Sequence, residues 1–76
     1  MARLPRPSGI ALIRFLERRG FIVRRIRGSH FFLRDGKQCT TCVPVHGNRP
    51  LAIGTLRSIL RDVEISADDF EREWHE

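Results

Sequence analysis

Two turn signals, Gly28-Ser29 and Asp35-Gly36, divide a β-prone stretch of the chain and constrain its fold. Residues 21–26 are rich in β-branched and aromatic side chains, and residues 30–34 have the same character after the first turn. Residues 38–45 supply a third β-prone segment after the second turn. Strands joined by such short turns pair antiparallel, so we expect a three-stranded antiparallel sheet.

Helical patterns lie on both sides of these strands in the sequence. Ser8 is placed to cap a helix over residues 10–19, where apolar residues recur at helical spacing, and Gly20 offers a left-handed stop. A second helix is expected with Thr55 as its N-cap, and a short third helix with Ser66 as its N-cap. We therefore predict an α+β fold of order α-β-β-β-α, with a short extra C-terminal helix and with helices covering one face of the sheet.

The chain of 76 residues has room for a single domain with a small core. We expect residues 1–7 to form an extended arm, residues 8–70 the core, and residues 71–76, including His75, a frayed tail. A domain of this size buries only about 60% of its unfolded surface, so a protein partner is expected. Because the sequence has neither a membrane-length apolar run nor a secretory signal pattern, we expect a cytoplasmic protein without membrane contact.

Charge is distributed unevenly along the chain. Residues 1–37 contain nine Arg and one Lys against two acids, a net +8, whereas residues 38–76 contain four Arg against seven acids, a net −3. Arginine matches phosphate oxygens and stacks on bases, so the first half favours a nucleic-acid partner. Alternatively, these cations form an ordinary solvated surface. The candidate RNA-binding residues are Arg24, Arg25, Arg27, Gly28, Arg34 and Lys37.

His30 follows the Gly-Ser turn and is close in sequence to several of these arginines. Cleaving RNA without a metal requires a base for the ribose 2′-hydroxyl, an acid for the leaving oxygen and positive charge at the phosphate. Histidine can transfer protons in either direction near neutral pH. His30 is therefore the candidate catalytic residue, with Ser29 and His46 as candidate support. Otherwise His30 is a solvated strand residue and His46 an ordinary loop residue.

Cys39 and Cys42 form a C-x-x-C pair with His46 nearby. A structural zinc site requires four ligands, and residues three apart in a strand point to opposite faces. The zinc signal is thus weak, and we predict reduced thiols with no metal and no small-molecule cofactor.

Three segments together resemble the HicA, or YcfA-like, mRNA interferase toxins of type II toxin-antitoxin systems. They are Gly28-Ser29-His30, Pro44-Val45-His46 and Leu51-Ala52-Ile53-Gly54-Thr55-Leu56-Arg57-Ser58-Ile59-Leu60. The resemblance implies a double-stranded-RNA-binding-domain-like fold, cleavage of mRNA with His30 as the catalytic residue, and a cognate HicB antitoxin as partner. Two features depart from the family. Phe31-Phe32 stands where many relatives have a polar residue after the histidine, and the C-x-x-C pair is no family hallmark.

The leading hypothesis is thus a toxin that cuts mRNA without a metal. One alternative is a non-catalytic RNA-binding module in which His30 only donates a hydrogen bond. A second is an interaction protein with no role at nucleic acids.

Overall fold

A computed structural model describes residues 4–74 and confirms the predicted element order. The elements are α1 (Gly9–Arg18), β1 (Ile22–Arg27), β2 (His30–Arg34), β3 (Thr40–Pro44), α2 (Ile53–Asp62) and α3 (Ala67–Glu73). The strands form one antiparallel sheet in the order β1-β2-β3, with β2 in the middle. This is an α+β domain compatible with the double-stranded-RNA-binding-domain-like fold.

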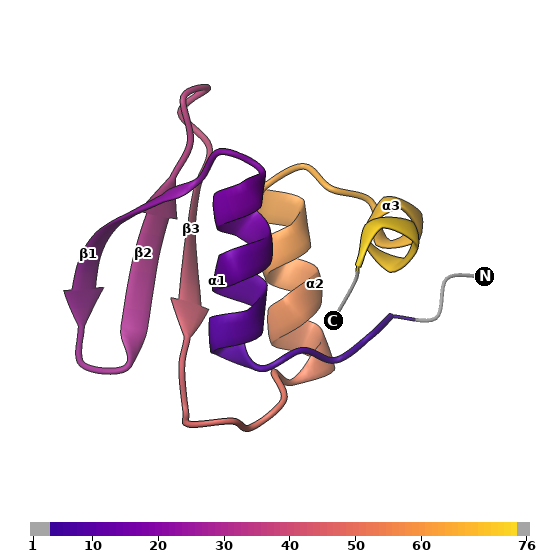
Figure 1. The fold of residues 1–76 in the computed structure, drawn as a ribbon, viewed down its shortest axis with the longest axis horizontal. Coiled ribbons are helices and arrows are strands. Elements are labelled where there is room, and N and C mark those ends of the chain that lie inside the picture. Colours follow the sequence, from indigo (N-terminus) through magenta and orange to yellow (C-terminus); the bar gives the residue numbers. More distant parts are fainter. Residues whose placement is uncertain (1–3, 75–76) are drawn as a thin grey trace.

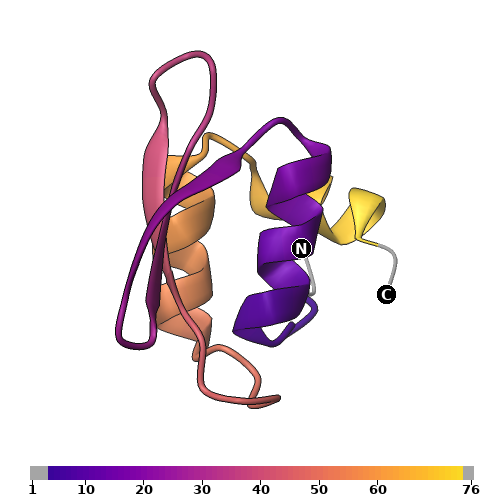
Figure 2. The same ribbon diagram turned by 60° about the vertical axis from the view of Figure 1, so that its left-hand side comes forward.

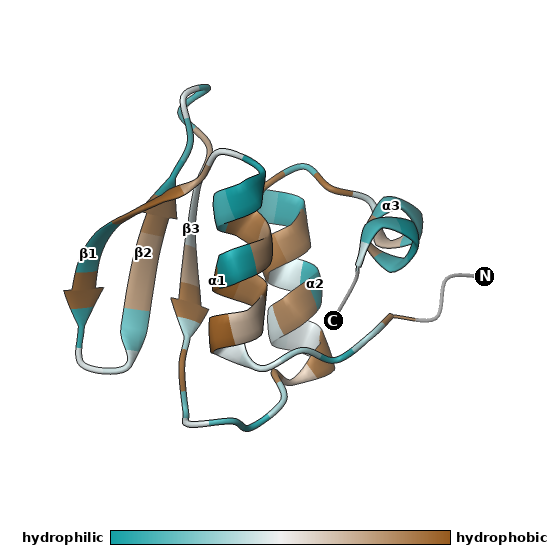
Figure 3. Ribbon diagram, in the orientation of Figure 1, coloured by the Kyte–Doolittle hydropathy of each residue, from teal (hydrophilic) through white to brown (hydrophobic). Residues whose placement is uncertain are grey.

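The helices are segregated to one side of the sheet. Figure 1 shows α1 and α2 side by side, and the turned view of Figure 2 places both on the same side of the three strands. In both views α3 lies beyond these helices, away from the sheet. Each of α1 and α2 carries both hydrophobic and hydrophilic bands, as expected of helices with one buried face (Figure 3).

The core fills the space between the sheet and the helices. Its largest fully buried side chains come from five of the six elements. They are Leu12 and Leu16 of α1, Leu33 of β2, Val43 of β3, Leu56 of α2 and Phe70 of α3. One small core is therefore shared by the sheet and all three helices.

The burial of β2 residues settles which face of the sheet meets the helices, a question that alternation alone leaves open. Leu33 is 1% exposed and Phe31 packs against the core, whereas His30 and Arg34 are exposed. We call the side of the sheet that carries His30, Phe32 and Arg34 the open face. In the described part of the chain no helix covers it (Figure 2).

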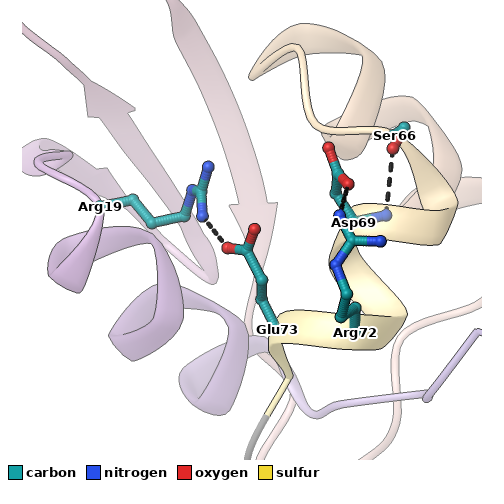
Figure 4. Close-up of polar contacts among 5 residues, drawn as sticks. All are labelled: Arg19, Ser66, Asp69, Arg72 and Glu73. Carbon is teal, nitrogen blue, oxygen red and sulfur yellow. Dashed lines mark hydrogen bonds and ion pairs between the residues drawn. The ribbon is translucent and has the colours of Figure 1, made fainter.

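The predicted caps of α1 and α3 are confirmed. The Ser8 side chain accepts a hydrogen bond from the Ala11 N–H at 3.2 Å, and Gly20 follows α1 with a φ of 97°. The Ser66 hydroxyl accepts from the Asp69 N–H at 3.0 Å (Figure 4). Local capping signals thus place both helix starts correctly.

The predicted cap of α2 is wrong. The N-cap is Ala52, which makes no side-chain hydrogen bond, and Thr55 lies inside the first turn. Long-range contacts hold the preceding backbone: the buried Leu51 donates its N–H to the Pro7 carbonyl at 2.8 Å, and the Arg6 guanidinium donates to the Leu51 carbonyl at 3.1 Å. Because these contacts fix the chain up to Ala52, the helix begins without a capping side chain.

The predicted frayed tail is also wrong for its first residues. Residues 71–73 form the last part of α3, and Glu73 makes an ion pair with Arg19 of α1 (Figure 4). The Trp74 ring lies 5.6 Å from that of Phe15 and 5.2 Å from that of Phe70, between centroids. Aromatic packing therefore holds the end of α3 on the core. His75 lies outside the described residues.

The expected arm is described only in part. Residues 4–7 contain no helix or strand, and the guanidinium of Arg6 fastens this segment to Leu51. Among residues 4–74 no helix is long and apolar enough to cross a membrane.

Candidate active site

His30 is the first residue of the central strand, and its side chain is exposed. The tight turn before it contains Gly28, whose φ of 56° suits a residue without a Cβ. The backbone carbonyl of the half-buried Ser29 that follows accepts a hydrogen bond from the Val45 N–H at 2.7 Å. This bond ties the turn to the end of β3, so His30 is presented from a fixed backbone.

Arg27 lies directly opposite His30 across the β1-β2 ladder. Directly opposed residues of an antiparallel pair point to the same face, with Cβ atoms about 4.5 to 5.5 Å apart. The guanidinium of Arg27 is exposed. A phosphate bound between these two side chains would therefore meet both a proton-transfer group and a fixed positive charge.

Arg25 and Phe32 form a second opposed pair on the open face. The Arg25 guanidinium carbon lies 4.8 Å from the centroid of the Phe32 ring, a cation–π contact. The ladder contains an irregularity between Val23 and Arg25, where Arg24 is an extra residue. This bulge brings Arg25, rather than Arg24, opposite Phe32.

The remaining predicted cations lie farther from His30. Arg34 is at the other end of β2, about 13 Å along the strand at the usual rise per residue, and its guanidinium hydrogen-bonds the Gln38 side chain. Lys37 is exposed in the following turn. The structure therefore groups Arg25 and Arg27 with His30 and places Arg34 and Lys37 at the far end of the sheet.

The sheet itself is strongly cationic. Its three strands contain four arginines and His30, and none of their residues is acidic. An anion approaching the open face meets positive charge along the two strands β1 and β2.

His46 lies in the loop after β3, two residues beyond Pro44, which is opposite His30 in the β2-β3 ladder. It lines a hollow of about 290 Å³ with Arg49, Leu51 and Thr55, at the start of α2. The two histidines thus lie on different surface features of the same end of the sheet.

Both cysteines are free and half-buried. Cys39 packs against the core, whereas Cys42 is opposite Phe32 in the ladder. Burial raises the pKa of the Cys42 thiol, with a smaller contribution from Asp62, and burial also raises the pKa of Cys39. Among residues 4–74, no three His, Cys, Asp or Glu side chains are grouped so as to hold a metal ion.

At Phe32, two residues along β2 from His30, the sheet borders a hollow of about 660 Å³. The hollow is lined by Arg24, Arg25, Phe32, Leu33, Arg34, Thr40, Thr41, Cys42 and Asp62. Sequence reasoning missed the parts of this wall that come from β3 and α2, because they depend on the register of the sheet. For Phe32 a signal was present, since alternation places it on the same face as His30.

The fold and the site together define a class of protein. It is an α-β-β-β-α domain that presents an exposed histidine among arginines on the uncovered face of its sheet. A family model described as HicA toxin of bacterial toxin-antitoxin matches residues 11–65, which is most of the chain. The chain therefore belongs to the HicA toxin family, whose members act in toxin-antitoxin systems with an antitoxin as partner. No curated protein matches it significantly.

Proposed function

We propose that this HicA-family protein is a metal-independent endoribonuclease that cleaves mRNA, with His30 as general acid or base. The observation that carries the proposal is the exposed His30 directly opposite Arg27 on the open face. A proton-transfer group and a fixed cation that converge on one surface are what phosphodiester cleavage requires of a protein without a metal.

The proposed reaction uses the ribose of the substrate as nucleophile. A base removes the proton of the 2′-hydroxyl, whose oxygen attacks the adjacent phosphorus, and the bond from phosphorus to the 5′-oxygen breaks. An acid protonates that leaving oxygen, which yields a 2′,3′-cyclic phosphate and a 5′-hydroxyl. DNA lacks the 2′-hydroxyl, so the chemistry selects RNA. His30 performs one of the two proton transfers, and His46 is the candidate for the other.

The arginines have two roles in this proposal. Arg27 stabilises the negative charge that develops on the phosphate oxygens during attack. The other cations of β1 and β2 hold the RNA backbone without reading its sequence. Gly28 and Ser29, in the turn before His30, offer backbone N–H groups to the same phosphate.

The antitoxin partner implied by the family is proposed to be a HicB-like protein that covers the open face. A partner bound there would bury His30 and neutralise the arginines together, which stops both RNA binding and cleavage. It would also add buried area to a domain with a small core. The proposed place of action is the cytoplasm, where mRNA is available.

A cleavage assay on purified protein with EDTA present tests the proposal. The wild type is expected to cut single-stranded RNA, and His30→Ala is expected to bind the same RNA by fluorescence anisotropy while cutting about 100-fold more slowly or less. Arg14→Ala, an exposed change on α1, is the control and should cut at the wild-type rate. If His30→Ala cuts RNA at the rate of the control variant, His30 is not the general acid or base.

A non-catalytic RNA-binding module is the second candidate, favoured by the Arg25–Phe32 pair, which resembles the stacking surfaces of RNA-binding domains. It predicts tight binding and no cutting by the wild type. The same assay separates the two functions.

A further inference from the structure

The hollow of about 660 Å³ at Phe32 has no role in the proton transfers just described. Its volume falls within the range of small-molecule sites, about 300 to 1,000 Å³. It combines an aromatic ring, cations and a carboxylate, and its Arg25 and Phe32 are an opposed pair on the open face. This composition suits a flat group with polar edges.

The Arg25–Phe32 pair gives the hollow a stacking surface. The Phe32 ring is half-buried, and the guanidinium of Arg25 lies over it at 4.8 Å. Unpaired bases of single-stranded RNA stack on aromatic rings and on guanidinium planes, whichever base is present. A base stacked here would extend an arrangement that the protein already holds.

The lining of the hollow places one carboxylate among three arginines. Asp62 of α2 lines the wall, and its carboxylate accepts a hydrogen bond from the Thr41 hydroxyl at 3.0 Å, which fixes its orientation. The carboxylate offers an acceptor to the N–H donors of a neutral base, while the arginines attract the phosphates on either side of that base. The cations Arg24 and Arg34 then lie where the flanking phosphates pass.

The position of the hollow relative to His30 fits one nucleotide. Phe32 is two residues along β2 from His30 and on the same face, a separation of about 6.6 Å at the usual rise. A phosphate at His30 and the base of an adjoining nucleotide at Phe32 can span that separation. In a duplex, pairing and stacking would keep the base out of the hollow.

We propose that this hollow binds the unpaired base of a nucleotide adjoining the scissile phosphate, stacked on Arg25 and Phe32. The inference rests on the proposed function, since it names a part of the RNA substrate. It makes Phe32 a positioning residue that determines where His30 meets the RNA. It also makes single-stranded RNA the substrate.

The test combines a protein change with a substrate change. The position cut by the wild type is first mapped, and an oligonucleotide with that one site is made with either flanking base removed but its ribose kept. For the wild type, loss of one of the two bases should slow single-turnover cleavage by about 10-fold or more. Phe32→Leu should slow cleavage of the intact oligonucleotide by a similar factor and should respond little to loss of that base.

Phe31→Leu is the matched control, because the same change is made one residue away on the helix-facing side. It should keep the wild-type ratio of intact to abasic rates, whatever it does to stability. Circular dichroism confirms that each variant is folded. If the effects of Phe32→Leu and of base removal simply multiply, the base does not lie on Phe32 and the inference is overturned.

A binding measurement keeps this result separate from a failure of the proposed function. In the His30→Ala background, a labelled hexanucleotide is compared with its fully abasic counterpart by fluorescence anisotropy, with and without Phe32→Leu. If the protein that retains Phe32 binds the intact and the abasic hexanucleotide with equal affinity, the proposed stacking site is contradicted, even if the wild type cleaves RNA. Absence of cutting by the wild type, with base-dependent binding retained, would instead overturn the nuclease and leave the site supported.

Discussion

The two faces of the β-sheet use neighbouring residues of the same strand for opposite purposes. Along β2, Leu33 is almost fully buried against the helices, while His30 and Arg34 face solvent. The helix-facing side contributes apolar surface to the core, and the open face contributes charge and a proton-transfer group. The proposed function thus lies where losing a side chain should cost the fold little, and the predictions below test that separation.

The largest expected effect is on the helix-facing side. Leu33→Ala should lower the free energy of unfolding by about 2 to 5 kcal/mol, because it leaves a cavity in a core with few other side chains. His30→Ala should change it by less than about 0.5 kcal/mol, as expected for an exposed residue. Urea unfolding followed by circular dichroism measures both. Comparable decreases in the free energy of unfolding for the two variants would contradict the separation of stability and function between the two faces.

The next effect concerns the contact between α1 and the end of β3. A Cβ at Gly9 would overlap the carbonyl oxygen of Pro44. Gly9→Ala should therefore cost about 1 to 3 kcal/mol, the usual range for overpacking. Gly36→Ala is the control, because a Cβ there has no neighbour within 4 Å. Equal unfolding midpoints in urea for the two variants would show that the helix can shift away from the sheet freely.

A smaller effect is expected from a single cation of the open face. Arg27→Ala should weaken RNA binding and reduce the slope of log affinity against log salt by about 0.7, the value for one phosphate contact on a single strand. Arg14→Ala removes the same charge from α1 and should leave the slope near that of the wild type. Anisotropy titrations at several salt concentrations supply the slopes. Matching slopes for the two variants would mean that net charge, not the open face, governs binding.

The smallest effect is chemical. Burial and, secondarily, Asp62 raise the pKa of Cys42, so less thiolate is present at neutral pH than in an exposed cysteine. At pH 7, iodoacetamide should react more slowly with the Cys42 thiol than with the thiol of free glutathione. This difference in rate should become smaller as the pH rises through the raised pKa of Cys42, and also when urea unfolds the chain. The rate is measured by mass spectrometry of Cys39→Ser protein. Alkylation as fast as that of glutathione would show that this part of the open face is fully solvated.

The sequence predicted the elements well because their signals are local. The capping hydroxyls of Ser8 and Ser66 and the turns at Gly28-Ser29 and Asp35-Gly36 act over a few residues. The start of α2 was missed because contacts from Pro7 and Arg6, far away in the chain, replace a capping side chain. Such contacts leave no local trace.

The candidate site was predictable only one strand at a time. Alternation groups His30 with Phe32, and composition points to the arginines of residues 24–27. The bulge between Val23 and Arg25 is a register detail that propensities do not encode, and it decides which residues of β1 lie opposite Leu33 and Phe32. The opposition of Arg27 to His30 follows from the two-residue turn between them, whereas the contributions of β3 and α2 to the hollow required the assembled fold.

The bulge and the arginines of β1 have a further effect on how this protein behaves at high concentration. β1 is an edge strand, paired only with β2 in the described part of the chain, and carries the exposed Ile22 and Ile26. Such an edge invites another copy to add its own strand, a route to aggregation. Three like charges and a local kink oppose that pairing between identical molecules. The side chains proposed to grip RNA would thereby also keep the free toxin monodisperse.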